Sequence, residues 1–166
     1  MKGYTCRVCG EYHDTMPLSY VADAPALWYT IPEQEREARA ALTTDTCIID
    51  DQHFFVLGNV ELPIVDSDQV FLWTVWVSLS PQNFERTLAL WEQSGRESEP
   101  HYFGWFSTSL PVYPETLNLK TYVHTRSVGQ RPLIELEPTE HPLAVDQRQG
   151  ITWERVQEFA ETLLHG

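Results

Sequence analysis

Two cysteines and a histidine near the start of the chain have the types and spacing of metal ligands. They lie in the segment CRVCGEYH, where Cys6 and Cys9 are separated by two residues and His13 follows four residues after Cys9. A Cys-x-x-Cys turn brings two thiolates to one side of a tight loop, and Gly10 can adopt the positive φ that such a loop needs. The segment therefore predicts a knuckle that binds a metal ion, and we expect that ion to be Zn²⁺.

A closed structural zinc site has four ligands, so two more side chains must complete the pair of thiolates. We expect the set Cys6, Cys9, His13 and Cys47, which uses all 3 cysteines and the imidazole nearest to the pair. His53 is the alternative histidine, six residues beyond Cys47. Two other hypotheses stay open: free thiols without a metal, and a redox-active or metal-sensing pair at Cys6 and Cys9.

A second group of chemically useful side chains lies in a predicted β-hairpin over residues 119–137. Alternation along LKTYVHTR puts its polar side chains on one face of a strand. In one register Glu135 of the partner strand lies opposite Tyr122, which gives a polar face suited to acid–base chemistry. The candidate catalytic residues are therefore Lys120, Tyr122, His124 and Glu135.

The simpler interpretation of this face is a solvated sheet surface held by cross-strand ion pairs. His101 and His141 are further histidines for a hydrolytic site, but no motif spacing connects them with His124. The chain also lacks the glycine-rich nucleotide loops, the GxSxG nucleophile motif and the HExxH zinc motif. We therefore favour a protein that is not an enzyme.

The charge of the chain restricts its partners. It carries 11 basic and 24 acidic side chains, a formal net charge of -13, and the acids are spread along the whole length. Such a field repels phosphate backbones and anionic lipids, which excludes nucleic acids and membranes as expected partners and favours a basic protein. With an odd number of cysteines and no apolar run of about 18 residues, we expect a cytoplasmic protein with reduced thiols.

The elements that must position these residues are those of an α+β fold. We expect a single domain over residues 1–166, with a largely antiparallel central sheet, helices packed on it and a small N-terminal knuckle over residues 1–15. Apolar residues on both faces of VFLWTVWVSLS indicate a central strand that is covered on both sides. Helices are predicted over residues 32–42, 81–95, 141–150 and 151–166, and strands over 46–50, 53–64, 70–80, 101–110, 117–126 and 131–138.

Several stretches of the sequence point to one bacterial family. They are CRVCGEYH, EREAR followed by DTCIID, WVSLSPQNF, YFGWFSTSLPVYPETLNLKTYVHTR and RPLIELEPTEHPLAVDQRQGIT. Through them the chain resembles domain-of-unknown-function family 2199 over nearly its whole length. The resemblance implies a bacterial single-domain protein without an assigned activity, and it carries no catalytic residue over to this chain. The cysteine pair and Cys47 both fall in the resembling stretches, as a shared metal site would require.

These observations favour an acidic protein-binding module that is stabilised by a structural zinc site. One alternative is a small hydrolase-like enzyme with its polar site on the 119–137 hairpin. Another is an antitoxin or immunity-type protein that binds a basic toxin. A deep pocket around His124 would favour the enzyme, whereas an open sheet face would favour the binding module.

Overall fold

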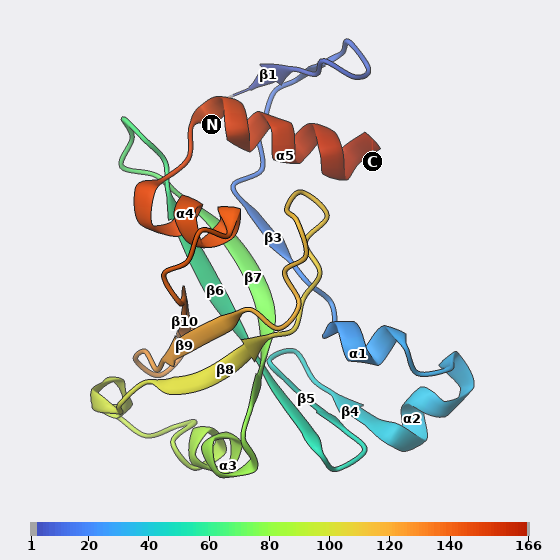
Figure 1. The fold of residues 1–166 in the computed structure, drawn as a ribbon, viewed down its shortest axis with the longest axis vertical. Helices are drawn as coiled ribbons and strands as arrows, with labels where there is room; N and C mark the ends of the chain where they lie inside the picture. The colour runs from blue at the N-terminus through green and yellow to red at the C-terminus, as the bar shows by residue number, and fades with distance from the viewer. Residues whose placement is uncertain (1–2, 166) are drawn as a thin grey trace.

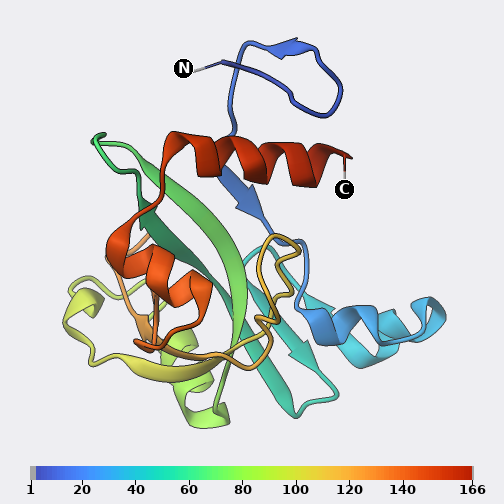
Figure 2. The ribbon, with the colours of Figure 1, turned by 45° about the horizontal axis from the view of Figure 1, so that its top comes forward.

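The computed structural model describes residues 3–165, which fold into a mixed α+β structure (Figures 1 and 2). The α+β class is therefore confirmed. No helix within this range has the length and apolar character of a membrane span.

The strands are β1 (Tyr4–Thr5), β2 (Tyr12–His13), β3 (Ser19–Val21), β4 (Ala40–Leu42), β5 (Thr46–Ile49), β6 (His53–Pro63), β7 (Val70–Leu79), β8 (Tyr102–Phe106), β9 (Lys120–His124) and β10 (Leu133–Leu136). The helices are α1 (Ala26–Tyr29), α2 (Arg36–Arg39), α3 (Pro81–Ala89), α4 (Pro142–Gln149) and α5 (Trp153–His165), with short 3₁₀ turns η1 (Glu33–Glu35) and η2 (Arg96–Ser98).

Five strands of the main sheet close into a barrel. β6 and β7 form a long antiparallel hairpin that begins with Phe54 opposite Leu79. β8, β9 and β10 continue from β7 as an antiparallel series, and β10 returns to β6 in parallel, with Leu133 opposite Asn59. β3 extends the sheet in parallel beside the first half of β7, and β5 and β4 extend it beside the first half of β6.

The closed barrel corrects the expectation of a plain, largely antiparallel sheet. Alternation along a sequence identifies strands, but it does not show whether the two edges of a sheet meet. Here they meet beside Gly58, where an added Cβ would lie 2.6 Å from Ile134 Cδ1 and 2.9 Å from the Pro132 carbonyl oxygen. The absent side chain allows this close approach, and the Asn59 N–H donates to the Pro132 carbonyl at 2.9 Å.

The core between β7 and the C-terminal helix α5 is made largely of aromatic side chains. Phe71 and Trp73 of β7 are buried, and their ring centroids lie 4.8 Å apart. Phe159 of α5 packs on both rings, with centroid distances of 5.2 Å and 5.0 Å. Val156 and Phe159 form the buried stripe of this helix. Trp76 belongs to a second core cluster, which confirms that β7 is covered on both sides.

The helix predicted over residues 32–42 is wrong over its last three residues. A 3₁₀ turn and α2 occupy its first part, and the chain becomes strand β4 at Ala40. Ala40 lies opposite Ile49 of β5, and next to this pair the Arg39 guanidinium donates two hydrogen bonds of 2.9 Å to Asp50. Alanine favours a helix, but its propensity is small beside the backbone hydrogen bonds of a new strand pair, so the tertiary pairing decides the conformation.

Candidate metal site

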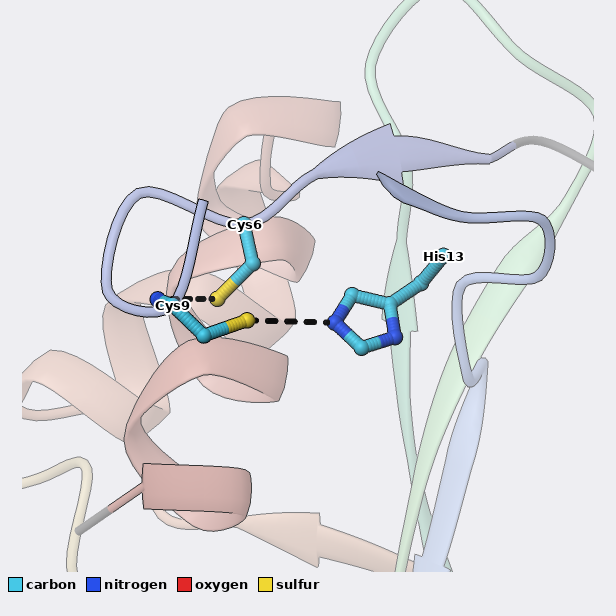
Figure 3. A group of neighbouring side chains, drawn as sticks. All are labelled: Cys6, Cys9 and His13. Carbon is cyan, nitrogen blue, oxygen red and sulfur yellow. Dashed lines mark hydrogen bonds between the residues drawn. The ribbon is translucent and has the colours of Figure 1, made fainter. Parts of the chain in front are cut away.

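Figure 3 shows Cys6, Cys9 and His13 gathered at the N-terminal hairpin. His13 lies on β2 opposite Tyr4, beside the strand that leads into the cysteine turn. One ligand atom from each residue, the two Sγ atoms and a ring nitrogen, all lie within 4.8 Å of one another. The Cys9 Sγ is 3.7 Å from His13 Nε2. Sulfur and nitrogen ligands of tetrahedral zinc are separated by roughly 3.6 Å, so the donor set fits Zn²⁺.

The backbone of the turn favours the thiolate form of Cys6. The Gly10 N–H donates to the Cys6 carbonyl at 2.9 Å, and Gly10 has a φ of 76°, the left-handed conformation expected for it. The Cys9 N–H points at the Cys6 Sγ, 3.5 Å away. This hydrogen bond is the main reason why the pKa of Cys6 is lowered, and it outweighs the burial that acts against it. The thiolate is the form that binds metals.

Cys47 is not brought to the knuckle. It is fully buried on β5, in the second core cluster with Ile49 and Trp76. β5 lies at the opposite end of the molecule from β1 (Figure 1). Burial raises the pKa of the Cys47 thiol to about 11, so this residue behaves as a small apolar side chain. His53, the alternative histidine, lies opposite Ile49 and therefore stays near Cys47 and not near Cys6.

The knuckle is fastened to α5 by an ion pair that the sequence analysis did not identify. The Arg7 guanidinium donates to Glu161 Oε1 at 2.7 Å, and the Arg7 backbone N–H donates to Glu161 Oε2 at 2.6 Å. The Gln157 side-chain amide adds a hydrogen bond of 3.0 Å to the Thr5 carbonyl. Arg7 and Glu161 are 154 positions apart, so no local spacing could have paired them. The only clue was an acid on the otherwise apolar face of the last helix.

Replacement of this acid by its amide, Glu161→Gln, is expected to lower the free energy of unfolding by about 1.5–3 kcal/mol, the range for hydrogen bonds to charged groups. Bonding to Arg7 holds the pKa of the Glu161 carboxyl at about 2, below its ordinary 4.5. A lowered folded-state pKa stabilises the protein above pH 4.5, and this contribution is lost as the pH falls towards 2.

Urea unfolding at pH 7 and at pH 3 checks this. The difference in the free energy of unfolding between wild type and Glu161→Gln should be largest at pH 7 and smaller at pH 3. Glu158→Gln, a change on the same helix at a side chain that is 45% exposed, is the matched control and should have almost no effect. An equal loss of stability in both variants, or a loss of stability that does not change with pH, would contradict the role given to Glu161.

The predicted hairpin adopts the expected register. Tyr122 lies opposite Glu135, and the Glu137 N–H donates to the Lys120 carbonyl at 2.9 Å. His124 Nε2 and Glu135 Oε1 form a hydrogen bond of 2.8 Å. The arrangement thus has the cross-strand pairs of a solvated sheet surface.

The four candidate catalytic side chains do not converge in one pocket. A depression of about 630 Å³ is lined by His124 and Glu135 but not by Lys120 or Tyr122. The His101 ring does join this face, 5.1 Å from Tyr122 and 5.4 Å from His124 between centroids.

His141 lies elsewhere. It caps α4 through its Nδ1, which accepts a hydrogen bond of 3.1 Å from the Leu143 N–H. The two further histidines considered for a hydrolytic site are therefore divided between the hairpin face and a helix terminus. This geometry does not favour the catalytic hypothesis.

Comparisons with known proteins agree with the sequence resemblance. The model of a family described as an uncharacterized protein conserved in bacteria, DUF2199, matches residues 5–151. That range contains Cys6, Cys9 and His13, the barrel strands and α4. No curated protein and no solved structure matches the chain.

Proposed function

Because the chain belongs to the DUF2199 family of uncharacterized bacterial proteins, we propose its function from the geometry of the site alone. It is a protein-binding module whose N-terminal knuckle is held in shape by a Zn²⁺ ion. The observation that carries the proposal is the convergence of three ligand atoms, from Cys6, Cys9 and His13, within 4.8 Å of one another. When bound, the ion would cross-link the turn to β2 and stabilise the docked hairpin.

The proposed site has three protein ligands among residues 3–165, because Cys47 lies elsewhere. Zinc usually has four ligands, so the fourth would be a water molecule or a side chain of a partner. Cys9 is exposed and His13 is half-buried, which leaves the site accessible from outside. In this respect the proposal differs from the closed four-ligand site expected from the sequence.

The surface around the ligands supports a role in binding. Val8, inside the cysteine turn, is 63% exposed, and Tyr12, next to His13, is 68% exposed. These are the highest exposed fractions among the large apolar side chains of the described residues. Tyrosine and apolar side chains at a surface are typical of protein interfaces. The net charge of -13 favours a basic partner, and the antitoxin or immunity-type role is one form of this function.

Metal content tests the first part of the proposal. Protein purified without a histidine tag should contain close to one Zn²⁺ per chain by elemental mass spectrometry. Cys9→Ser should lose most of this zinc, and because Cys9 is exposed, its replacement leaves the core intact. Cys47→Ala, which removes a thiol outside the site, is the matched control and should retain the zinc. Zinc-free wild type, or equal zinc in all three proteins, would contradict the site.

The interaction is tested with the same wild-type protein and a Val8→Ser, Tyr12→Ser double variant. Capture of a basic protein from bacterial extract should weaken as salt rises from about 0.05 M to about 0.5 M, because salt screens exposed charges. It should weaken further in the double variant, which keeps the zinc ligands. If the amount of captured protein changes neither with salt nor with these substitutions, the knuckle is not the surface that binds a partner.

A further inference from the structure

A cavity of about 670 Å³ lies far from the knuckle, between α3, η2 and the loop that joins β9 to β10. In Figure 1 these segments lie together at the lower end of the barrel, whereas the knuckle lies beyond α5. The volume is in the range of small-molecule sites, which are concave and largely apolar with a few polar groups. No residue of the proposed metal site lines it.

Part of the cavity lining is apolar and buried. Val56 and Val123 of the barrel contribute buried side chains, together with the ring of Tyr102. Leu90 and Trp91, which follow α3, form the outer apolar wall, and Trp91 is 38% exposed. A partly exposed tryptophan on the wall of a cavity offers a flat apolar surface to a ligand.

The rim of the cavity carries guanidinium groups with unused donors. Arg131 Nε donates to Asp45 at 2.7 Å, and Arg126 Nη1 donates to Glu61 at 2.7 Å. Within residues 3–165 both Nη atoms of Arg131 and the Nη2 of Arg126 donate no hydrogen bond. Both side chains line the cavity, so these N–H groups are available to a bound acceptor.

The charge of the lining is opposite to that of the chain. The lining contains three of the 11 basic residues, Arg96, Arg126 and Arg131, but only two of the 24 acidic ones, Asp45 and Glu92. Asp45 is already paired with Arg131. Arg126 is likewise paired with Glu61, which lies outside the lining. The lining still carries one more basic than acidic side chain in a chain of net charge -13, which favours an acceptor group that the rest of the surface would repel.

Arg96 holds the rim in place. Its guanidinium donates to the carbonyl oxygens of Arg126, Ser127 and Gln130 at 2.7 Å, 3.1 Å and 3.0 Å, and to that of Trp91 at 3.0 Å. One side chain therefore ties the β9–β10 loop to the segment after α3. A site that is fixed before binding loses less conformational entropy when its ligand arrives.

We propose that this cavity binds a small amphipathic carboxylate, with its apolar part against Trp91 and the barrel floor and its carboxylate on Arg126 and Arg131. The planar guanidinium fork matches a carboxylate in two parallel hydrogen bonds. The size and apolar floor of the cavity favour a carboxylate that carries an alkyl or aromatic group over a free inorganic anion. This inference does not depend on the metal site.

Calorimetric titration of the full chain with sodium octanoate and with octylamine tests the proposal. Octanoate should bind, and octylamine, of the same chain length and opposite charge, should not. Arg131→Gln should weaken octanoate binding about tenfold or more, which corresponds to the loss of a charge-assisted hydrogen bond. Arg148→Gln removes an exposed arginine outside the cavity and should leave the affinity unchanged.

Arg126→Gln is the second variant, used if Arg131→Gln does not show the wild-type circular dichroism spectrum and melting curve. The proposal as a whole is overturned by any of three results, and the amphipathic nature of the ligand by a fourth. The three are no octanoate binding by the wild type, equal binding of octanoate and octylamine, and equal weakening in the cavity variant and in Arg148→Gln. If acetate binds as strongly as octanoate, the cavity is an anion site only, and the proposed contact with an apolar part of the ligand is wrong.

Discussion

Replacement of Phe159 by alanine is expected to lower the free energy of unfolding by about 3–5 kcal/mol, the range for large-to-small changes in a packed aromatic core. Phe159 is fully buried, and its ring packs against Phe71, Trp73 and Tyr113, with centroid distances of 5.2, 5.0 and 5.8 Å. The change leaves a cavity where α5 meets β7. Since a domain of this size has a total stability of about 5–15 kcal/mol, much of it would be lost.

Urea unfolding followed by circular dichroism measures this effect. Leu164→Ala is the matched control, because Leu164 lies on the same helix but is 56% exposed. We expect the control to stay within about 0.5 kcal/mol of wild type. A small loss for Phe159→Ala would mean that α5 does not pack on β7. The knuckle would then have no firm support, since Arg7 is held by Glu161 of the same helix.

Local patterns in the sequence were sufficient for most of the secondary structure. A helix was predicted to begin at residue 81, and α3 does begin at Pro81, where the preceding Ser80 side chain accepts a hydrogen bond of 3.1 Å from the Asn83 N–H. Period-two alternation identified β7 and the two strands of the β9–β10 hairpin, and the register assumed for that hairpin is the one observed. These features depend on neighbouring residues, so they can be read within one window of sequence.

The predictable part of the metal site is local in the same way. Cys6, Cys9 and His13 lie within one hairpin, and their proximity follows from that turn. Cys47 was added only because zinc requires four ligands, with no local pattern to place it. The fold instead uses it as a buried apolar residue of β5.

Features that join distant parts of the chain were missed. The Arg7–Glu161 pair and the Arg96 contacts that build the cavity rim both depend on how elements pack. The closed barrel is the largest such feature. The alternation of apolar and polar residues does not specify how the strands tilt or how their register is staggered, and these decide whether a sheet closes. The edge strands of an open sheet and of a closed barrel show the same alternation.

Barrel closure can be tested at Gly58. Gly58→Ala is expected to lower the free energy of unfolding by about 1–3 kcal/mol, because the new methyl group would overpack the seam between β6 and β10. The nearest atoms belong to Ile134, at 2.6 Å and 2.7 Å, and to the Pro132 carbonyl, at 2.9 Å. Only the side-chain atoms of Ile134 can be removed by mutation.

A double-mutant cycle with Ile134→Ala therefore separates closure from a general effect of the new side chain. Ile134 is fully buried, and its truncation alone should cost about 2–5 kcal/mol. In that background Gly58→Ala should cost less, by about 1 kcal/mol, because the space it needs is already free. The residual cost would report the contact with the Pro132 carbonyl. A parallel cycle of Gly58→Ala with the exposed Leu164→Ala should be additive. Additivity in both cycles would mean that Gly58 and Ile134 are not in contact, and the sheet would then be open at this seam.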